Sequence, residues 1–409
     1  MLTLLDRRGG RHTLPHHDGD SVAQALLRHG IPPTSVVVYR DADQTPVTDD
    51  SVVSSEIDYT ARLIEGYDID GVRHLYNGEL PSVGGQPSVF EGLLKRRLAV
   101  APDGKLSMER TRLDNSAGAQ HVEETVVDTI ERFGLLPEGC TVVLGLSGGV
   151  DSGSLLMLLS SYRRLRPSMN IQVQAATFED FDSRYSETFS FASRLAERFD
   201  IKHSLVEADK AEHVFNLVRP IEQILLLLME SDDAHQAMYV DHHTTRRVLE
   251  VFADEVGANT VALGLHTTDL LAGLLNSWTS GYDVGPIPER QIGIYRYILP
   301  LAFVPKRELH LYYANQLGHL PKQTTPNQWE FNPTDRNFYY YLADHLQWLW
   351  PGLQHWAFTA HNEQASQTVK FDTCENCGGA AREQPNSPAW SGLCDVCALF
   401  DKHGWLRMS

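Results

Sequence analysis

Residues 121–345 alternate short apolar runs with longer amphipathic segments. β-Branched and apolar residues dominate the runs at 141–146, 171–178, 201–206 and 260–263, and such runs predict buried strands. Apolar positions spaced three or four apart predict helices over 121–133, 186–198 and 246–255. This alternation indicates an α/β fold with a parallel, doubly wound sheet. Ligands of such sheets bind beside the carboxyl ends of the strands, so the loops after Leu146, Thr177 and Leu263 are expected to face one ligand.

The first 70 residues alternate at shorter range. The pattern predicts strands at 2–5, 12–14, 35–39 and 59–64, and a helix over 22–29. The order ββαβ…β resembles the β-grasp, the ubiquitin-like fold of the sulfur-carrier proteins. Those carriers act through a free C-terminal Gly-Gly, whereas Gly84-Gly85 lies inside this chain. We therefore expect a docking or lid module rather than a carrier.

The sequence Ser147-Gly148-Gly149-Val150-Asp151-Ser152 separates the predicted strand 141–146 from an apolar run at 153–159. Glycines let the backbone approach an anion, and the N–H groups at a helix start point toward it. A carboxylate beside a phosphate requires a cation between them, so Asp151 predicts Mg²⁺. The Walker pattern, which ends in Gly-Lys-Ser/Thr, is not present here.

The loop resembles the PP-loop of the N-type ATP pyrophosphatases, whose signature is Ser-Gly-Gly-x-Asp-Ser. The resemblance implies an adenine-nucleotide α-hydrolase-like sheet and cleavage of ATP to AMP and pyrophosphate, with adenylation of a carbonyl oxygen. The cofactors expected are ATP and Mg²⁺. The residues expected to contact the nucleotide are Leu146, Ser147, Gly148, Gly149, Val150, Asp151, Ser152, Thr177, Phe178 and Gly264.

A second resemblance lies further along the chain. Gly264-Leu265-His266-Thr267-Thr268-Asp269 is similar to the Gly-His-Asn-x-Asp-Asp of the tRNA thiolation group, the 2-thiouridine synthetases and cytosolic thiouridylases. Leu270 replaces the second Asp of that pattern. The later Arg-x-x-Pro-Leu and Lys-x-Glu patterns are matched by Arg296, Pro300, Leu301, Lys306 and Glu308, with one extra residue after Arg296.

The resemblance implies a catalytic set of Asp151, His266, Asp269 and Lys306. His266 and Asp269 would place Mg²⁺ or the adenylated oxygen, and Lys306 would neutralise the leaving pyrophosphate. Two alternatives stay open: a helix cap for Asp269 and a surface salt bridge for Lys306.

The chain departs from the thiolation group in its cysteines. Tyr239 and His242 occupy the positions of that group's Cys-x-x-Cys, and Thr324-Thr325-Pro326 stands where a further Cys is expected. Thiolates hold the sulfur or the cluster in those enzymes. We therefore expect no iron–sulfur cluster, and any sulfur must come from a separate donor.

Two other groups invite a functional interpretation. Asp241-His242-His243 is either a metal site or base, or a solvated helix start, and we favour the second. Cys140 directly precedes the central strand. A small buried filler is the better interpretation of this cysteine.

The remaining four cysteines form two Cys-x-x-Cys pairs, Cys374 with Cys377 and Cys394 with Cys397. This spacing predicts a four-thiolate zinc ribbon. With all four positions taken by protein ligands, the Zn²⁺ is expected to be structural.

Composition narrows the class of protein. The 409 residues are 42 % hydrophobic and 22 % charged, which is typical of globular proteins. The net charge of −18 argues against a broad nucleic-acid surface, although Lys95-Arg96-Arg97 and Arg110-Thr111-Arg112 supply local positive charge. No apolar run reaches membrane-spanning length and no leader is visible, and the cysteine usage suits a reducing cytosol, so a cytoplasmic location is expected.

These patterns predict four segments: a β-grasp domain over 1–70, a linker or degenerate metal-free ribbon over 71–120, the PP-loop domain over 121–345, and an aromatic segment with the zinc ribbon over 346–409. The leading hypothesis is an adenylating enzyme that supports thiolation of a tRNA or a small-molecule acceptor, with a sulfur-donor or carrier protein as partner. A homodimer is left open. The alternatives are an amide-forming PP-loop ligase and a non-catalytic nucleotide-binding interaction module.

Overall fold

The computed structural model describes residues 1–5, 10–64, 93–100, 106–178, 184–207, 209–280, 284–318, 334–365, 371–382 and 392–407. The chain divides into two compact units, and each is built from separate stretches of sequence. Unit 1 comprises Met1–Val126, Leu265–Val284 and Leu301–His361. Unit 2 comprises Val127–Gly264, Gly285–Pro300 and Asn362–Ser409. Gly84-Gly85 and Thr324-Thr325-Pro326 lie outside the described residues.

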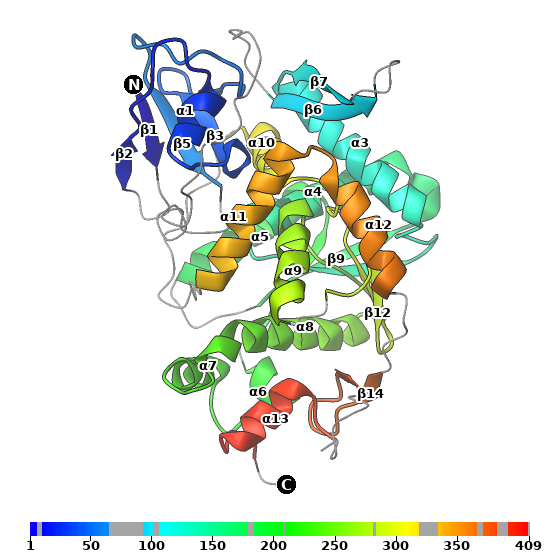
Figure 1. Cartoon of the computed structure of the whole chain (residues 1–409). Coiled ribbons are helices and arrows are strands. Elements are labelled where there is room, and N and C mark those ends of the chain that lie inside the picture. The colour runs from blue at the N-terminus through cyan, green and yellow to red at the C-terminus, as the bar shows by residue number, and fades with distance from the viewer. Residues whose placement is uncertain are drawn as a thin grey trace. The chain divides into compact units, whose positions relative to one another are not determined.

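Unit 2 is built on a six-stranded sheet with the order β10-β9-β8-β11-β13-β12 (Figure 1). Its strands are β8 (Thr141–Gly145), β9 (Gln172–Phe178), β10 (Lys202–Val206), β11 (Thr260–Ala262), β12 (Glu289–Ile292) and β13 (Tyr295–Ile298). All neighbours pair in parallel except β12, which is antiparallel to β13 at the edge. The predicted parallel α/β sheet is therefore confirmed. The chain runs outward from β8 in one direction and then returns to continue from β11 in the other, so the strand order reverses between β8 and β11.

Helices connect these strands and complete unit 2. They are α4 (Val150–Leu165), α5 (Arg184–Arg198), α6 (Lys210–Phe215), α7 (Ile221–Met229), α8 (Ala237–Glu255) and α13 (Asp395–Lys402), with short 3-10 turns at Pro167–Met169 and Ala234–Gln236. Helix α4 buries its whole run of residues 155–159. A helix apolar on every side is stable only when it is enclosed, which is the environment of a connection packed on a parallel sheet.

Helix α8 is longer than the sequence pattern predicts. The apolar period indicates a start near Arg246, but the helix begins at Ala237. The additional turns carry Asp241-His242-His243-Thr244-Thr245, whose polarity masks the helical period. His243 and Thr244 are nevertheless buried.

The C-terminal segment belongs to unit 2. It contains β14 (Phe371–Thr373), β15 (Ala380–Arg382) and α13, which Figure 1 shows near α8. The tail is anchored between α6 and α7, because the Val218 N–H donates to the Trp405 carbonyl at 2.9 Å. Lys402 and His403 both bind the Asp233 carboxylate, at 2.6 and 2.9 Å.

Unit 1 contains a five-stranded mixed sheet with the order β2-β1-β5-β3-β4. Its strands are β1 (Leu2–Leu5), β2 (Arg11–Thr13), β3 (Val36–Arg40), β4 (Thr45–Pro46) and β5 (Tyr59–Leu63). Helix α1 (Val22–Arg28) begins with a capping box between Ser21 and Gln24. The elements lie close to the predicted positions, and the β-grasp assignment itself stays a prediction.

The other helices of unit 1 come from distant parts of the chain. They are α9 (Thr267–Ser280), α10 (Lys306–Leu317) and α11 (Thr334–Leu349), with a 3-10 turn at Pro33–Ser35, while α3 (Asn115–Phe133) and α12 (Leu353–Ala365) divide their residues between the units. Tyr341 of α11 lies in the same buried cluster as Leu2, Leu4 and Leu26. Arg307 of α10 forms paired bonds to the Asp49 carboxylate at 2.9 and 3.0 Å. The N-terminal sheet therefore shares its core with α10 and α11.

A β-hairpin occupies part of the segment predicted as a linker or degenerate ribbon. Strands β6 (Leu93–Val100) and β7 (Leu106–Leu113) pair antiparallel. Arg96 stacks its guanidinium 3.7 Å from the centre of the Trp348 ring, and Arg112 pairs with Asp50. In each of the two basic runs, one arginine thus contacts another residue of unit 1. Within the described part of the chain, the helices are too short or too polar to span a bilayer.

Candidate active site and metal centre

The loop between β8 and α4 lies at the point where the strand order of the unit 2 sheet reverses. Gly148 has φ +76°, a left-handed conformation that glycine adopts without strain. The Ser147 and Ser152 hydroxyls are 3.0 Å apart, and the Ser147 N–H donates to the Ser152 Oγ at 3.2 Å. Helix α4 begins after Gly149 without a side-chain cap. The uncapped helix start, with its positive dipole end, suits an anion.

Asp151 and Gly264 meet at this loop. Asp151 lies half-buried in the first turn of α4. Gly264 follows β11, and a Cβ atom at Gly264 would lie 3.4 Å from the backbone of Asp151 and Ser152. The loop after β11 therefore packs on the loop after β8, as expected at a topological switch point.

Thr177 joins the end of β9 to the same loop. Its hydroxyl donates to the Leu146 carbonyl at 2.6 Å and lies 2.7 Å from His203 Nε2. Because the only hydroxyl proton goes to the carbonyl, His203 must donate its Nε2–H to Thr177. Thr177 is 2 % exposed. Its hydroxyl therefore stabilises the loop through the hydrogen bond to the Leu146 carbonyl. Phe178, the next residue, is half-buried.

His266, Asp269 and Lys306 form a second group, in unit 1. The His266 N–H donates to Asp269 Oδ2 at 3.2 Å, and the Asp269 N–H donates back to His266 Nδ1 at 3.3 Å. This reciprocal pair caps α9, so Asp269 has the helix-cap role, and its catalytic role stays a prediction. Lys306 is 6 % exposed, so a surface salt bridge is the wrong interpretation for it.

The surroundings of Asp269 favour its carboxylate form. Burial raises the pKa of Asp269, but His266, Lys306 and the Tyr340 hydroxyl together outweigh burial and leave it below its ordinary value. Tyr340 donates directly to Asp269 Oδ1. The group therefore holds a negative carboxylate beside a buried lysine. The four predicted catalytic residues thus divide between the units, with Asp151 in unit 2 and the other three in unit 1.

The four cysteines of the two Cys-x-x-Cys pairs come together and are all buried. Their sulfur atoms all lie within 4.8 Å of one another, and Cys377 Sγ and Cys394 Sγ are 3.9 Å apart. A tetrahedral ion with bonds of about 2.3 Å places its sulfurs about 3.8 Å apart. The donor set therefore fits one tetrahedral metal ion. Over the described ranges, no other group of three His, Cys, Asp or Glu side chains is close enough to bind a metal, so Asp241-His242-His243 forms no such site.

Hydrogen bonds from the surrounding chain support the sulfurs. The Cys394 N–H donates to Cys374 Sγ at 3.2 Å, and the Asn376 side-chain amide donates to Cys397 Sγ at 3.3 Å. Gly378 has φ +66°, which turns the backbone after the first pair. These are the turn and the N–H donors expected of a metal knuckle.

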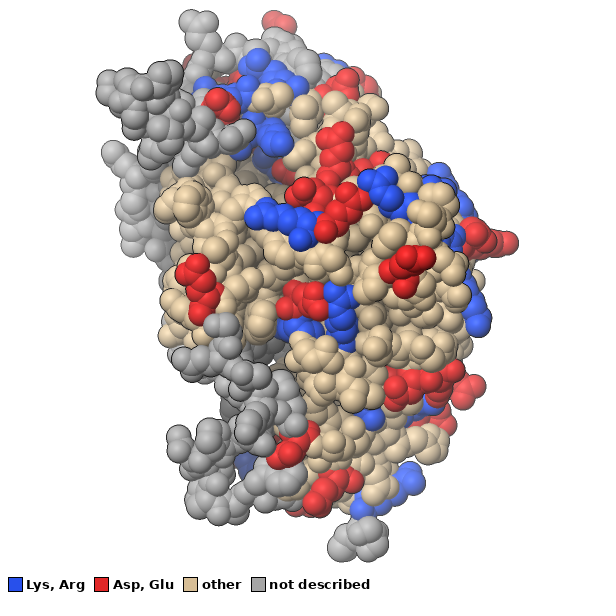
Figure 2. Space-filling view, turned by 90° about the vertical axis from the view of Figure 1, so that its right-hand side faces the viewer, with Lys and Arg blue, Asp and Glu red and all other residues tan. Residues whose placement is uncertain are grey.

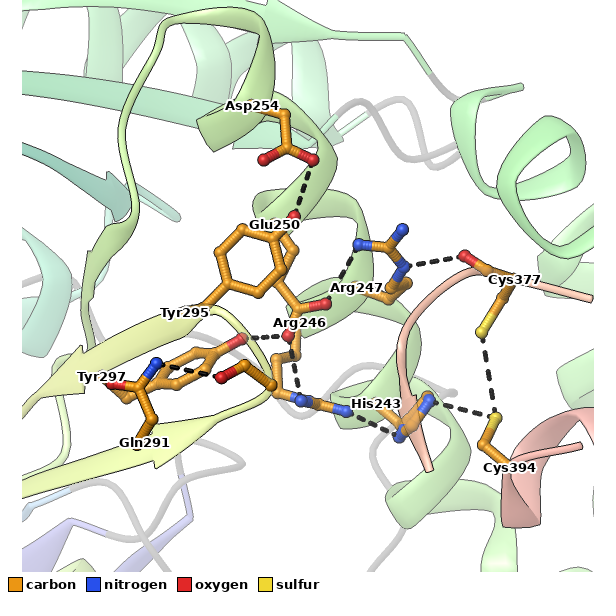
Figure 3. Close-up of polar contacts among 11 residues, drawn as sticks. His243, Arg246, Arg247, Glu250, Asp254, Gln291, Tyr295, Tyr297, Cys377 and Cys394 are labelled. Atoms are coloured by element: carbon orange, nitrogen blue, oxygen red, sulfur yellow. Dashed lines mark hydrogen bonds and ion pairs between the residues drawn. The ribbon is translucent and has the colours of Figure 1, made fainter. Parts of the chain in front are cut away.

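Helix α8 fixes the cysteine group to the sheet (Figure 3). Arg247 Nε donates to the Cys377 carbonyl at 2.9 Å, and Arg247 Nη1 binds Glu250 at 3.1 Å. Glu250 is fully buried and also accepts from Arg246 at 2.9 Å and from the Tyr297 hydroxyl of β13. The four-cysteine group, α8 and β13 are therefore joined by one network of charge-assisted hydrogen bonds.

His243 lies between this network and the cysteines. Its Nδ1 is 3.2 Å from Arg246 Nη2, and its Nε2 is 3.6 Å from Cys394 Sγ. Burial, and then the positive charge of Arg246, lowers the pKa of His243 to about 3. A solvated helix start is therefore wrong for His243, whereas its neighbours Asp241 and His242 are exposed.

Cys140 lacks the features of a reactive thiol. It is half-buried just before β8, and burial raises its pKa. A nucleophilic cysteine needs the opposite shift, toward the thiolate. The prediction of a small filler is the better account of this residue.

A profile of the asparagine synthase family matches residues 138–356, more than half of the chain. The chain belongs to the asparagine synthase family. The match contains the loop and the sheet of unit 2, and it confirms the resemblance to the PP-loop ATP pyrophosphatases.

Individual relatives are more distant. The chain is 27 % identical over 186 residues to a tRNA-cytidine(32) 2-sulfurtransferase from Polynucleobacter necessarius, and 25 % identical over 208 residues to one from Neisseria meningitidis. The matches cover 45 % and 50 % of this chain and 56 % and 60 % of the relatives. The chain thus spans little more than half the length of these proteins.

One solved structure shares the fold. It is the U34-tRNA thiolase NcsA from Methanococcus maripaludis with its [4Fe-4S] cluster, at a TM-score of 0.54 and 18 % identity. The likeness covers 73 % of this chain and 92 % of the thiolase. At this identity the likeness concerns the fold alone.

Several site residues could not be found from the sequence. His203, Tyr340 and Glu250 reach their partners across long sequence separations, of 26, 71 and 47 residues. None of them lies in a motif, and no local period marks them. Only the parallel order of β8, β9 and β10 would have suggested His203, since it places the three strands side by side.

Proposed function

We propose that this protein is an ATP-dependent adenylating enzyme of the PP-loop class that acts in tRNA thiolation. The observation that carries the proposal is the Ser-Gly-Gly-Val-Asp-Ser loop at the switch point of a parallel sheet, with Gly264 packed against it. The backbone N–H groups at the start of α4 would hold the phosphates of ATP. The names of the relatives and the family match also support this proposal.

The proposed chemistry has two steps. The carbonyl oxygen of the acceptor attacks the α-phosphorus of ATP, and the bond to the β-phosphate breaks so that pyrophosphate leaves with the electron pair. Hydrosulfide or an equivalent sulfur donor then attacks the activated carbon, and AMP leaves. No oxidant or reductant is required when the donor is at the oxidation level of sulfide.

Asp151 is proposed to hold Mg²⁺, which would neutralise the negative charge of the phosphates. Its carboxylate lies in the first turn of α4, where it is close to any phosphate held by the loop. A hard cation with oxygen ligands resolves the repulsion between carboxylate and phosphate. Asp269 and Lys306 are proposed to serve the same reaction, Lys306 by neutralising pyrophosphate.

The acceptor is proposed to be a nucleobase of tRNA, and the sulfur to come from a separate donor protein. The relatives' names support tRNA as acceptor. Cys140, the one cysteine outside the metal group, has a raised pKa, which supports an external donor. The N-terminal sheet is proposed to be a β-grasp module on which that donor docks.

The cysteine group is proposed to hold one structural Zn²⁺. The spacing of the sulfur atoms suits a single tetrahedral ion, and all four ligand positions are filled by protein. Metal analysis of the purified chain tests this: one zinc and no iron per chain is the expected result. Iron with acid-labile sulfide would contradict it.

A pyrophosphate-release assay tests the adenylation. The mixture contains ATP, Mg²⁺, sulfide and unmodified tRNA, and it compares the wild type with Asp151→Asn. We expect a loss of about 100-fold or more, as for removal of one electrostatic group from an active site. Asp128→Asn, which changes an exposed acid of α3, is the control and should leave the rate unchanged. Equal release by wild type and Asp151→Asn would end the proposal.

The family match keeps amide formation as a second candidate, because the profile is named for asparagine synthase. Mass spectrometry of the acceptor separates the two. Replacement of oxygen by sulfur adds about 16 Da, whereas replacement of a carbonyl oxygen by a nitrogen group leaves the mass nearly unchanged. An ATP-binding protein that forms no AMP under either condition would instead be an interaction module.

A further inference from the structure

We propose that His243 is a positioning residue of the four-cysteine metal centre, where it donates a hydrogen bond from Nε2–H to the Cys394 thiolate. The inference rests on the zinc site proposed above. It concerns helix α8, which lies outside both Cys-x-x-Cys pairs. The consequence is that retention of the metal depends on α8 as well as on the ribbon.

The geometry places the imidazole directly on the sulfur. His243 Nε2 is 3.6 Å from Cys394 Sγ, within the range of an N–H···S hydrogen bond. His243 is 7 % exposed and Cys394 is 3 % exposed. Figure 3 shows the ring between Arg246 on one side and Cys394 on the other. In such a buried setting the hydrogen bond is stronger than at a wet surface.

The partner on the other ring nitrogen decides which nitrogen carries the proton. Arg246 Nη2 lies 3.2 Å from His243 Nδ1. A guanidinium has donors only, so Nδ1 must accept. The single proton of a neutral imidazole is then on Nε2, the atom that faces Cys394.

Arg246 is itself held in place. Its Nη1 donates to Glu250 at 2.9 Å, and Glu250 is fully buried. The ring orientation therefore follows from a chain of contacts that begins in the core of unit 2. A carboxylate, guanidinium and imidazole in series form a rigid support for one metal ligand.

The chemistry of four thiolates explains the need for such a donor. Four thiolates around a divalent ion carry a net charge of −2, which N–H groups disperse. Cys394 Sγ also accepts the Cys397 N–H at 3.5 Å. His243 supplies to Cys394 a side-chain donor from outside the ribbon. Loss of an outer partner of this kind typically weakens metal binding 10- to 100-fold.

The competing explanation is that His243 only fills space beside the cysteines. Two substitutions distinguish this packing role from the hydrogen-bonding role. The ring of His243 lies 6.1 Å from that of Phe215 and 5.9 Å from that of Tyr239. His243→Phe keeps an aromatic ring but removes the donor. His243→Gln loses the ring but restores an N–H donor of similar reach. A hydrogen-bonding role predicts that Gln is the better substitute, and a packing role predicts that Phe is.

The experiment measures zinc release from the full chain into excess chelator, followed by absorbance. We expect His243→Phe to release zinc about 10- to 100-fold faster than wild type, and His243→Gln to stay within about threefold. His242→Phe changes the exposed neighbour and should match the wild type. Wild-type release from His243→Phe, or equal release from the Phe and Gln variants, would overturn the inference.

A measurement on the unaltered protein keeps the inference testable if the variants fail to fold. Nitrogen-15 NMR of histidine-labelled protein reports which ring nitrogen of His243 carries the proton. Protonated Nε2 with bare Nδ1 supports the inference, and protonated Nδ1 overturns it. Wild-type protein that contains no zinc would refute the zinc site and this inference together, whereas zinc-loaded protein with equal release rates would refute this inference alone.

Discussion

Single residues around the loop act mainly through hydrogen bonds to the backbone. Thr177 was selected from the sequence because it ends a strand, yet its hydroxyl binds the Leu146 carbonyl and His203. A buried carbonyl that loses its donor costs about 1–3 kcal/mol, because its hydration is not restored. The side chain therefore stabilises the position of the loop, and the contact of Thr177 with the nucleotide stays a prediction.

This gives a prediction for Thr177. Thr177→Val keeps the volume of the side chain but leaves the Leu146 carbonyl without its donor, so the KM for ATP should rise severalfold and the Tm should fall. Thr177→Ser keeps the hydroxyl and should retain near wild-type values. Kinetics of pyrophosphate release and thermal unfolding check both variants. Equal KM and Tm values for the valine and serine variants would show that the hydroxyl does not stabilise the loop.

For a second residue, Glu308, we expect a contribution to stability that depends on its protonation. Burial raises the pKa of Glu308 to about 7, although Arg307 and Lys95 act to lower it. The folded state binds the Glu308 proton more tightly than the unfolded state does. Glu308 therefore contributes to the free energy of unfolding at low pH, and this contribution is lost as the pH rises from about 4.5 to about 7. The loss amounts to about 3 kcal/mol at most, from 1.36 kcal/mol per pKa unit.

Glu308→Gln should remove that loss. The variant is expected to be as stable as wild type near pH 5 and to have a higher Tm near pH 8. Glu124→Gln, an exposed acid on α3, is the control and should not change the pH dependence. Thermal unfolding across this pH range makes the comparison, and parallel curves for wild type and Glu308→Gln would refute it.

At the scale of elements, the sequence predicted the features that are set by residues close together in the chain. It missed those that depend on contacts between residues far apart in the chain. The strand, loop and helix over 141–159 were found because one continuous stretch carries the apolar runs and the glycines. The cysteine group was found because its spacing is local. Helix α8 was placed nine residues too late, since its first turns bury His243 and Thr244 against other elements rather than presenting an apolar stripe.

Helix α8 also gives the clearest prediction about an element. Glu250 pairs with Arg246 and Arg247 and accepts a hydrogen bond from Tyr297 in the core of unit 2. Glu250→Gln leaves two partly buried guanidinium groups without their counter-charge, which should cost about 3–5 kcal/mol. Glu255→Gln removes an exposed pair with Lys210 at the end of the same helix and should cost less than about 1 kcal/mol. Similar unfolding temperatures for the two variants would show that the network contributes little.

At the scale of the whole molecule, the acidic charge limits how a tRNA could be held. The net charge is −18, and on the face in Figure 2 the basic side chains lie among acidic ones. Two arginines of the β6–β7 hairpin are used inside unit 1. Recognition of a polyanion by such a surface must depend on local contacts rather than on a general positive field.

The division into two units was also beyond the sequence pattern. Unit 1 takes residues 265–284 and 301–345 from the segment predicted as one PP-loop domain, and residues 346–361 from the predicted aromatic segment. The reason lies in the shared core, where Tyr341 packs with the N-terminal sheet. Such contacts join residues more than 300 positions apart, as in the bond from Tyr341 to the Gly30 carbonyl at 3.0 Å, and no composition boundary marks them.

The central claim is that the loop between β8 and α4 holds the phosphates of ATP, and calorimetric titration with ATP and Mg²⁺ tests it most directly. Gly148→Ala and Gly139→Ala both place a side chain at a left-handed backbone position, at φ +76° and +73°, but only Gly148 lies in the loop. We expect wild type and Gly139→Ala to bind ATP alike, and Gly148→Ala to bind at least about tenfold more weakly, equivalent to about 1.4 kcal/mol. Absence of binding by the wild type, or equal affinity of the two variants, would contradict the account.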